Sequence, residues 1–334
     1  MKEADNMESK ARITAIGTYI PEKVLTNADF EKMVDTSDEW IVQRTGIKER
    51  RIAAEDEYVT DLCENAARNL AKNFNKSLDD VDLILVATVT GEYKFPSVSS
   101  QIQARLGLKN TGAIDLGGAC AGFVYGLHMA NGLVSSGLHK KVLVLGGETL
   151  SKITDYTDRT SCILFGDGAG AALVEYDAEN PGFFGFHMGT KGEGGRHLYQ
   201  TGLSTKLNGE ELTNPGKLVQ NGREVYKWAV SGVPKGVKKL VEEANMSLDD
   251  IDWFIPHSAN MRMVESICDR LDYPIEKTLT SMAYAGNTSS ATIPLAFDFA
   301  LQENKVKDGD TMLLYGFGGG LTECGIIIKW DPKA

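Results

Sequence analysis

Hydrophobic positions along the chain follow two patterns, helical spacing in some stretches and short continuous apolar runs in others. Residues 62–74 and 230–244 carry apolar side chains at the spacing of an amphipathic helix. Each stretch is followed by a closely similar segment, Ser-Leu-Asp-Asp-Val-Asp from Ser77 and Ser-Leu-Asp-Asp-Ile-Asp from Ser247, which leads into an apolar run. Both copies therefore predict a helix followed by a strand.

A second pair of similar segments lies further along the chain. The run Lys-Val-Leu-Val-Leu-Gly-Gly, which contains Gly146, resembles Thr-Met-Leu-Leu-Tyr-Gly-Phe, which contains Gly316, and these two glycines have the same separation as Ser77 and Ser247. Between these anchors, the Gly-Ala-Cys120 turn lies near the place where Gly-Asn287 falls, at a slightly smaller offset. A period of about 170 residues is too long for a solenoid and indicates a duplicated α/β unit.

The alternation of helix and strand predicts an α/β fold whose sheets are mostly parallel and covered by helices. We expect an N-terminal half over residues 11–180 and a C-terminal half over residues 181–334, packed face to face. Ligands on such sheets bind beyond the carboxyl ends of the strands, so matching strand ends of the two halves should converge on one site. The polar, glycine-containing stretch 189–221 predicts a long surface loop or lid.

Composition excludes several classes of protein. The chain has 334 residues, of which 42% are hydrophobic, and its formal net charge of −11 argues against a nucleic-acid binder. Five scattered cysteines, with no Cys-x-x-Cys pair, indicate a reducing cytosol rather than a disulfide framework or a zinc cluster. Residues 1–10 are polar and show no signal peptide, and no apolar run approaches the ~20 residues that span a membrane. We therefore expect a cytoplasmic protein.

Cys120 is the strongest candidate for chemistry. A short apolar stretch runs into Gly117 and Gly118, and a helical pattern follows the cysteine, which places it at a strand-to-helix turn. Unpaired N–H groups in the first turn of a helix favour negative charge and are expected to lower the pKa of the thiol. Small neighbours leave room for a substrate carbonyl, so Cys120 could accept an acyl group. The alternative is a small buried residue that fills a tight turn.

His257 and Asn287 follow predicted strands of the second half. Taken singly, each is more often a structural residue, a satisfied histidine or a turn asparagine. Taken with Cys120 at a matching strand end, they form a pair of donors that can hold an oxyanion or an enolate. The glycine-rich stretch 316–320 follows another strand and predicts either an anion cradle or a close backbone approach to Cys120, of which the second fits better.

Two further features suggest binding surfaces. Trp40 and Arg44 lie in a basic stretch that either is a solvated loop or binds an adenine ring and phosphates. Lys227 and Arg262 could form a local positive face on an otherwise acidic protein. Such a face would suit an acidic carrier partner.

Five motifs together resemble the β-ketoacyl-[acyl-carrier-protein] synthase III family of the thiolase superfamily, the condensing enzymes that initiate bacterial fatty-acid synthesis. The resemblance covers about residues 11–331. The motifs are Ser37-Asp-Glu-Trp-Ile-Val-Gln-Arg-Thr-Gly-Ile, Gly118-Ala-Cys-Ala-Gly-Phe, Asp158-Arg with Phe165-Gly-Asp-Gly-Ala-Gly, Pro256-His-Ser-Ala-Asn and Gly286-Asn-Thr-Ser-Ser. The family implies the thiolase fold, a five-layer αβαβα sandwich built from two duplicated halves, and a homodimer. One departure is Ser258, where many members carry glutamine.

The resemblance also implies residue roles. Cys120 resembles the acylated nucleophile, and His257 and Asn287 resemble the pair that assists decarboxylation. The positions that match coenzyme A contacts are Trp40, Arg44, Thr45, Arg159, Gly222 and Asn260. The positions that match the carrier-protein-binding segment are Lys227, Ser258, Ala259, Asn260, Met261 and Arg262. The positions expected to shape the acyl pocket and the oxyanion site are Phe95, Leu150, Leu164, Phe165, Gly318, Gly319 and Gly320.

The implied reaction proceeds in two half-reactions. Cys120 takes an acyl group from acyl-coenzyme A, and malonyl-acyl-carrier protein then enters, loses CO₂ and attacks the acyl-Cys120 thioester. The resemblance implies neither a metal nor a cofactor, since the thioester is already activated and decarboxylation drives the condensation. The primer stays open, because short acyl groups differ by methylenes worth only ~1–3 kcal/mol each in a pocket.

Other readings of the same residues remain as alternatives. A papain-type hydrolase also uses Cys, His and Asn, but its local cysteine context is absent from this chain. Thiolases and hydroxymethylglutaryl-coenzyme A synthases share the fold but differ at the third catalytic residue, where Asn287 fits the synthase III pattern. A type III polyketide synthase would act on larger coenzyme A starters without a carrier protein, and a non-catalytic acyl-binding paralogue would show no turnover.

Overall fold

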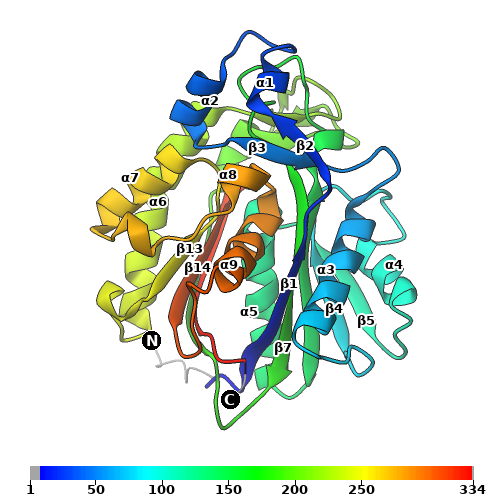
Figure 1. Ribbon diagram of the computed structural model, residues 1–334, viewed down its shortest axis with the longest axis vertical. Coiled ribbons are helices and arrows are strands. Elements are labelled where there is room, and N and C mark those ends of the chain that lie inside the picture. The colour runs from blue at the N-terminus through cyan, green and yellow to red at the C-terminus, as the bar shows by residue number, and fades with distance from the viewer. Residues whose placement is uncertain (1–7, 333–334) are drawn as a thin grey trace.

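Two sheets, each made from one part of the chain, form the framework of the protein (Figure 1). The structure is a computed structural model, and it describes residues 8–332. We expect no signal peptide in residues 1–10, and residues 1–7 of this stretch lie outside the described residues. The first sheet has the strand order β1 (Ala11–Tyr19), β7 (Asp167–Tyr176), β6 (Lys141–Thr149), β4 (Leu83–Ala87) and β5 (Gly112–Leu116). The second sheet has the order β8 (Phe183–Thr190), β15 (Thr322–Lys329), β14 (Thr311–Gly318) and β13 (Trp253–Pro256).

The prediction of mostly parallel sheets is wrong, because both sheets are mixed. β4 pairs in parallel with β5 and β6, whereas β7 pairs antiparallel with both β6 and β1. The second sheet repeats this arrangement, since β13 and β14 are parallel and β15 is antiparallel to β14 and β8. In the second sheet the short connection between β14 and β15, residues 319–321, requires antiparallel pairing, because parallel strands need a long crossover. In the first sheet β6 and β7 are antiparallel although the longer segment 150–166 joins them.

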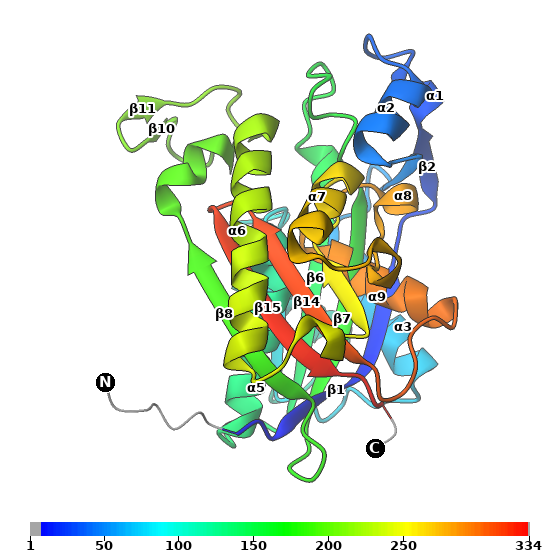
Figure 2. The ribbon, with the colours of Figure 1, turned by 90° about the vertical axis from the view of Figure 1, so that its left-hand side faces the viewer.

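Helices form three further layers. α5 (Gly122–Ser135) and α9 (Thr292–Gln302) each contact both sheets and make the central layer. α3 (Val59–Asn73) and α4 (Val98–Arg105) cover the outer face of the first sheet, and α6 (Gly222–Glu243) lies across the outer face of the second beside α7 (Met261–Leu271) (Figure 2). The five-layer αβαβα sandwich expected from the resemblance is confirmed.

Smaller elements surround this framework. The short helices are α1 (Asn27–Phe30), α2 (Asp38–Thr45) and α8 (Met282–Ala285), and the short 3₁₀ helices are η1 (Ala119–Ala121), η2 (Leu150–Lys152), η3 (Gly192–His197), η4 (Leu248–Asp250), η5 (Ile275–Lys277) and η6 (Ser289–Ala291). The two-stranded sheets are β2 (Lys23–Thr26) with β3 (Glu49–Ile52), β9 (Leu198–Gln200) with β12 (Leu218–Gln220), and β10 (Lys206–Leu207) with β11 (Glu210–Glu211). The predicted loop 189–221 therefore contains two small antiparallel pairs of strands.

The pattern of apolar residues explains where the helices lie. α3 is amphipathic and buries one face, including Leu62, Ala66 and Leu70, against β1, β6 and β7. α5 is apolar around most of its circumference because a sheet covers it on both sides. Close contact in this layer requires small residues: a Cβ on Gly126 would lie 2.8 Å from Cγ1 of Val144 in β6. Helix α5, which follows Cys120, is thus held close against the first sheet.

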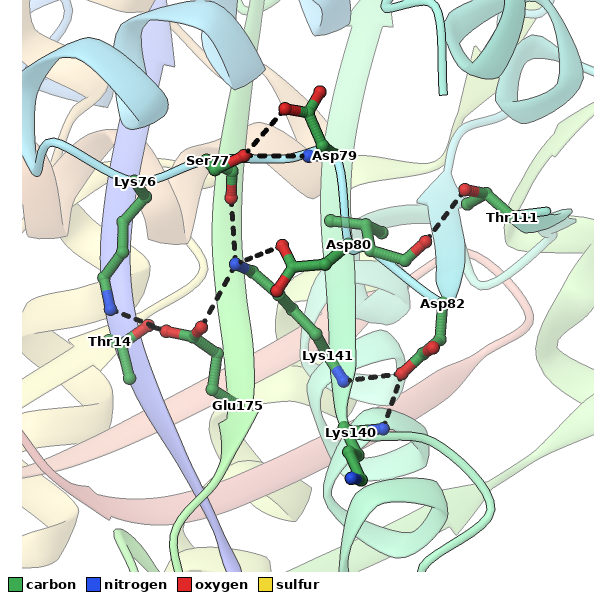
Figure 3. A network of polar contacts seen from close by, with 11 residues as sticks. Thr14, Lys76, Ser77, Asp79, Asp80, Asp82, Thr111, Lys140, Lys141 and Glu175 are labelled. Atoms are coloured by element: carbon green, nitrogen blue, oxygen red, sulfur yellow. Dashed lines mark hydrogen bonds and ion pairs between the residues drawn. The ribbon is translucent and has the colours of Figure 1, made fainter. Parts of the chain in front are cut away.

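Hydrogen bonds confirm the repeat at the other end of the sheets. The carboxylate of Asp82 accepts from the N–H groups of Lys140 and Lys141 at 2.6 and 2.9 Å, where β6 begins (Figure 3). Asp252, the matching aspartate of the second copy, accepts from the N–H of Thr311 at 2.8 Å, where β14 begins. In both halves the last aspartate of the repeated segment fixes the start of the neighbouring strand.

The same network also shows where the halves have diverged. The Lys141 ammonium lies 2.8 Å from Asp80 and 3.3 Å from Glu175, and Glu175 accepts further bonds from Lys76 and Thr14 (Figure 3). The matching residue of the second half is Thr311, which is too short to make these ion pairs. The charged cluster therefore belongs to the first half alone.

Backbone conformation corrects the alignment of the two halves. Ala119 and Ser289 both adopt a positive φ, 44° and 51°, and each begins a 3₁₀ turn that leads into a central helix. Their separation equals that of the repeated segments, so the position that matches Cys120 is Ser290, and the predicted match to Asn287 is wrong. Strands of the first sheet lie within residues 11–176 and those of the second within 183–329. The division into halves at residue 180 stays a prediction.

Candidate active site

A mostly apolar cavity of about 300 Å³ lies between the two halves. Cys120, His257 and Asn287 all line it, although they come from η1, from the end of β13 and from the loop before η6. The ends of β5, β13 and β14 point toward this region, as the rule for ligand sites on such sheets requires. The predicted convergence of strand ends thus places the three residues around one space.

Cys120 is held between two backbone segments. It lies in the single turn η1 that joins β5 to α5, and the end of β14 packs directly against it. A Cβ on Gly318 would lie 2.7 Å from both Cβ and Sγ of Cys120, so only glycine allows this approach. The prediction that the stretch 316–320 approaches the cysteine closely is confirmed.

Burial dominates the acidity of the Cys120 thiol. Loss of hydration raises its pKa to about 11, and the charge of Glu148 acts in the same direction. The Ser289 hydroxyl and the N–H of Gly319 oppose this rise by hydrogen bonding to sulphur. The prediction that the helix terminus gives a lowered pKa is therefore wrong for the protein without a ligand, because desolvation outweighs the nearby donors. A thiol with a pKa this high needs a group that accepts its proton before it can act as a nucleophile.

His257 is buried and neutral. Burial lowers the pKa of its imidazole to about 3, and its ring meets Phe317 edge-on at a centroid distance of 5.3 Å. Nδ1 lies 2.8 Å from Oγ1 of Thr292, which also lies 2.9 Å from the carbonyl oxygen of Ser289. The threonine hydroxyl has one proton. The Ser289 carbonyl can only accept, so this proton goes either to that carbonyl or to Nδ1. Only while the hydroxyl donates to Nδ1 does the imidazole carry its own proton on Nε2 and present a donor to a ligand.

Asn287 is fixed on three sides. Its N–H donates to the carbonyl of Leu164 at 2.8 Å, and its own carbonyl accepts from the N–H of Gly166 at 3.0 Å. Its side-chain Oδ1 accepts from the N–H of Ser289 at 2.9 Å. With the amide oxygen occupied, the NH₂ group is the part of the side chain left to donate to a ligand. The Asn287 amide could act with an imidazole protonated on Nε2 as the donor pair expected from the sequence, and this role stays a prediction.

Most of the predicted acyl-pocket residues line the cavity, but two do not. The ones that do are Leu150, Phe165, Gly318, Gly319 and Gly320. Leu164 is buried outside the lining, and its carbonyl holds Asn287 instead. Phe95 is 85% exposed and lies outside the cavity, so the prediction is wrong for the single chain.

Part of the cavity wall comes from segments that sequence reasoning did not assign to it. Leu198 and Leu218 belong to the strand pair β9 and β12, and Val225 and Met263 belong to α6 and α7. Isolated apolar residues such as Leu198 and Leu218 in the otherwise polar stretch 189–221 could have indicated that this stretch contributes to the cavity wall. The stretch predicted as a surface loop or lid therefore covers one side of the cavity.

The predicted coenzyme contacts divide into exposed and buried residues. Trp40 and Arg44 lie on α2, with the guanidinium 5.7 Å from the centre of the exposed indole. Arg159 is exposed and donates to the carbonyl of Asp35 at 2.8 Å. Thr45 is buried, and its hydroxyl both donates to the carbonyl of Ile41 and accepts from the N–H of Ile47. These bonds give Thr45 a structural role at the end of α2 and speak against direct contact with a ligand.

Gly222 and Asn260 lie at helix starts. Gly222 is the exposed first residue of α6, and Asn260 caps α7 through a bond from the N–H of Met263 to its Oδ1 at 2.9 Å. The side-chain oxygen of Asn260 is therefore engaged, while its NH₂ group is left to reach a ligand. Neither placement contradicts the predicted contacts, which stay predictions.

The predicted carrier-protein segment is only partly on the surface. Arg262 is exposed, and its Nε donates to the carbonyl of Gln43, which joins α7 to α2. Lys227 is exposed on α6 and pairs with Glu224 at 2.7 Å. Ala259 lines the cavity, and Met261 packs against Gly46. Ser258 is fully buried and accepts from the N–H of Ser281, so it cannot touch a docked protein.

Three observations bear on cofactors, membranes and redox state. Within residues 8–332, no group of three or more His, Cys, Asp or Glu residues could hold a metal ion. Over the same range, the helices are too short or too polar for any of them to cross a membrane. All five cysteines are buried and unpaired, as the scattered spacing indicates.

Comparisons with known proteins agree with this geometry. The family model described as 3-oxoacyl-[acyl-carrier-protein (ACP)] synthase III matches residues 114–192, and the model for its C terminal matches residues 241–330. The beta-ketoacyl-[acyl-carrier-protein] synthase III 2 of Halalkalibacterium halodurans is 63% identical over 322 residues, which cover 96% of this chain and 97% of that protein. The protein of the same name from Bacillus subtilis is 59% identical over 322 residues, with 96% and 99% covered.

A solved structure shows the same fold. The crystal structure of the synthase III from Thermus thermophilus superimposes with a TM-score of 0.93 at 43% identity, over 96% of this chain and 99% of that one. Fold, cavity and sequence therefore agree that the chain belongs to the β-ketoacyl-[acyl-carrier-protein] synthase III family of the thiolase superfamily.

Proposed function

We propose that the chain catalyses the decarboxylative condensation of a short-chain acyl-coenzyme A primer with malonyl-acyl-carrier protein. The product is a 3-oxoacyl-acyl-carrier protein, which initiates fatty-acid synthesis. The observation that carries the proposal is the meeting of Cys120, His257 and Asn287 around one buried apolar cavity. The names of relatives that cover almost the whole chain support the same reaction.

The first half-reaction is acyl transfer. The Cys120 sulphur attacks the carbonyl carbon of the primer thioester, the new C–S bond forms, and the bond to coenzyme A breaks. The backbone N–H groups near Cys120 and Gly320 would stabilise the negative charge on the carbonyl oxygen. The apolar walls of the cavity suit an aliphatic acyl chain and exclude the water that would hydrolyse the acyl-enzyme.

The second half-reaction is decarboxylation and condensation. The malonyl thioester oxygen would accept hydrogen bonds from Nε2 of His257 and the amide of Asn287. As the C–C bond to the carboxylate breaks, its electron pair forms an enolate that these donors stabilise. The enolate carbon then attacks the acyl-Cys120 thioester and releases the thiol. A neutral imidazole suits this role, because a donor without charge does not hold the malonyl carboxylate in place.

The surface beside the cavity suits the two thioester carriers. Trp40 and Arg44 on α2 form an exposed aromatic and cationic pair for the nucleotide end of coenzyme A. Arg262 lies against the same helix and presents a positive charge for an acidic carrier protein. The proposal includes no metal and no cofactor, and the expected cytoplasmic location stays a prediction.

A homodimer is the proposed assembly. β5 is an edge strand of the first sheet, and its Ile114 is 52% exposed. Tyr93 and Phe95, in the loop after β4, are 60% and 85% exposed. Uncovered edge strands and apolar side chains of this kind favour pairing with a second copy. The partner would cover the side chains that the single chain leaves in solvent.

Reconstitution with purified substrates tests the proposed function. The protein is mixed with malonyl-acyl-carrier protein and a panel of acyl-coenzyme A primers, and the carrier protein is weighed by mass spectrometry. The expected product is a 3-oxoacyl-carrier protein that depends on the primer and on Cys120. Free acid or coenzyme A released without a condensed product would instead indicate a hydrolase.

A charge reversal tests the carrier surface in the same assay. Arg262→Glu should raise the KM for malonyl-carrier protein more than the KM for the primer, because only the carrier brings a protein surface. Lys72→Glu is the matched control, since it makes the same charge change on α3, away from the cavity. Equal KM values for the two variants would remove Arg262 from the docking face.

A further inference from the structure

Glu148 is a buried carboxylate that the proposed mechanism does not use. It lies in β6 with no solvent exposure. Within residues 8–332, no lysine, arginine or histidine forms an ion pair with it, so hydrogen-bond donors alone stabilise any charge it carries. An isolated buried carboxylate is costly, and such groups concentrate at functional sites.

The two oxygens of Glu148 differ in their surroundings. Oε2 accepts from Thr90 at 2.7 Å, from the N–H of Val89 at 3.1 Å and from Thr88 at 3.2 Å. Oε1 has only longer contacts, to the hydroxyls of Ser289 and Ser290 at 3.3 and 3.4 Å and to the N–H of Val89 at 3.3 Å. Oε1 is therefore the oxygen that can take up a proton without losing a strong bond.

Ser289 connects this carboxylate to the nucleophile. Its hydroxyl lies 3.3 Å from Oε1, and Ser289 lines the same cavity as Cys120, where its hydroxyl lowers the pKa of the thiol. Its N–H holds the amide oxygen of Asn287 at 2.9 Å, and its positive φ of 51° fixes this position in the turn η6. Ser290 lacks such a link, because its hydroxyl has a closer acceptor in the carbonyl of Ala87 at 3.0 Å.

We propose that Ser289 and Glu148 form a proton path that accepts the thiol proton of Cys120 during acyl transfer. The proposal rests on the proposed function and names the group that takes this proton. The S–H proton passes to Oγ of Ser289, and the proton of Ser289 passes to Oε1 of Glu148. Thiolate and neutral carboxyl thus replace thiol and carboxylate, with no change in net charge.

The remaining bonds balance in the same step. The thiolate forms the bond to the acyl carbon, and the C–S bond to coenzyme A breaks. The proton returns from Glu148 through Ser289 to the departing thiolate, which leaves from the carbon beside the Cys120 sulphur. Ser289 contacts the reacting sulphur and is a catalytic residue in this scheme, whereas Glu148 acts through it and is a positioning residue.

Electrostatics favour Glu148 over His257 as the acceptor. Burial raises the pKa of Glu148 to about 7 and lowers that of His257 to about 3, so the carboxylate is the stronger base. The other titratable groups near the carboxylate are the thiols of Cys120 and of Cys63 in α3. Glu92 and Asp115 act on Cys63 in the same direction as Glu148 does. These neighbours are acidic or neutral, and they favour a protonated Glu148 once the thiolate forms.

Alkylation of Cys120 by iodoacetamide tests the path without any thioester substrate. The rate is measured from about pH 5 to pH 9, and modification of Cys120 is read by peptide mass. In the wild type, the rate should rise with an inflection near the pKa of Glu148, about 7, and then level off, because one proton is shared between thiol and carboxylate.

Four variants decide the outcome. Ser289→Gly keeps the positive φ, and it should lose the inflection and react roughly tenfold more slowly at pH 8, as a one-unit shift in thiol pKa would give. Glu148→Gln should also lose the inflection. Ser290→Ala and His257→Asn should keep it, because neither residue lies on the path.

Two results of the alkylation experiment would contradict the proposed proton path. An inflection that persists in Ser289→Gly, or that disappears in His257→Asn, would overturn the proposal. If Glu148→Gln does not fold by circular dichroism, Ser289→Gly decides alone, since it leaves the carboxylate and its other donors in place. An intact inflection without any acyl adduct from acyl-coenzyme A would contradict the proposed function and leave the proton path standing.

Discussion

At the scale of single residues, the chemistry of His257 depends on one hydroxyl. Thr292 is fully buried at the start of α9, and it is the hydrogen-bond partner of Nδ1. This contact orients the imidazole, and whether the hydroxyl donates to Nδ1 or to the Ser289 carbonyl determines which ring nitrogen carries the proton. The proposed catalytic histidine is therefore oriented by a residue 35 positions further along the chain.

Replacement of Thr292 by valine keeps the shape of the side chain and removes the hydroxyl. We expect malonyl thioester decarboxylation to fall by roughly tenfold to a hundredfold, somewhat less than the loss that follows removal of a preorganised donor itself. Acylation of Cys120 should change far less, because His257 does not act in that step. Single-turnover measurements of each half-reaction check this, and an equal loss in both would indicate a purely structural role.

Glu148 gives the protein an unusual dependence of stability on pH. Its pKa in the folded protein is about 7, above the ordinary value of 4.5, because burial disfavours the charge. The folded state therefore holds a proton that the unfolded chain has released. This contribution is full below pH 4.5 and is lost as pH rises through 7, by about 3 kcal/mol in total.

Urea unfolding at several pH values measures this effect. Between pH 4.5 and 7, the free energy of unfolding of the wild type should fall by about 3 kcal/mol relative to Glu148→Gln, which cannot ionise. Above pH 7 the two curves should run parallel. Parallel curves over the whole range would mean that Glu148 ionises in the folded protein as it does in the unfolded chain.

Sequence reasoning identified three residues that line one cavity, but it did not identify their surroundings. Cys120, His257 and Asn287 lie in short local motifs, and the geometry brings them together as expected. Burial of Ser258 and exposure of Phe95 could not be predicted, because burial depends on which distant segment packs against a residue. The partners of the catalytic residues lie in the turn η6 and just after it, where a serine or a threonine looks like any ordinary cap residue.

At the scale of elements, the end of β14 determines access to the nucleophile. The strand runs past η1 so closely that Gly318 lies against Cys120, whereas a side chain on the next residue, Gly319, would point toward Ala119 and Leu198 instead. A Cβ on Gly319 would be 3.3 Å from Ala119 and would not touch the sulphur. The position of Cys120 should therefore tolerate a side chain at residue 319 but not at residue 318.

Alanine at each position tests this difference. Gly318→Ala should lower the rate of Cys120 acylation by roughly a hundredfold, the size of effect that a displacement of about 1 Å has on a reacting group. Gly319→Ala, the adjacent control, should acylate at close to the normal rate. Rapid-quench mass spectrometry measures both, and similar rates in the two variants would show that β14 does not constrain the cysteine.

Element types were largely predictable, whereas strand direction was not. The amphipathic stretches 62–74 and 230–244 are helices in the structure, and the apolar runs after them are strands. Periodicity reports which faces are buried but not how a strand connects to its neighbours. The antiparallel β7 and β15 therefore escaped prediction, and the turn into β15 places the glycine-rich segment after β14 beside Cys120.

At the scale of the whole molecule, duplication explains why the site lies between the halves. Each half supplies a central helix preceded by a strained turn, at Ala119 and at Ser289. In the first half the residue after the strained one is Cys120, and in the second it is Ser290. One copy of the turn thus carries the proposed nucleophile, and the other carries groups that surround it.

The proposed dimer also belongs to this scale. Ile114→Lys places a charge on the exposed edge strand β5 and should give particles with the mass of one chain, where the wild type has the mass of two. Ile275→Lys is the matched control, since that residue is 38% exposed in the second half, and it should remain dimeric. Analytical ultracentrifugation decides, and a dimeric Ile114→Lys would place the interface elsewhere.

The acyl-Cys120 intermediate is tested most directly by the intact mass of the protein after incubation with acyl-coenzyme A primers. The wild type should gain the mass of one acyl group, and Cys120→Ala should gain none, because the cavity brings a single nucleophile to the primer. The most abundant adduct would also identify the primer class. An adduct of equal amount on Cys120→Ala, or no adduct on the wild type with any primer, would contradict the intermediate.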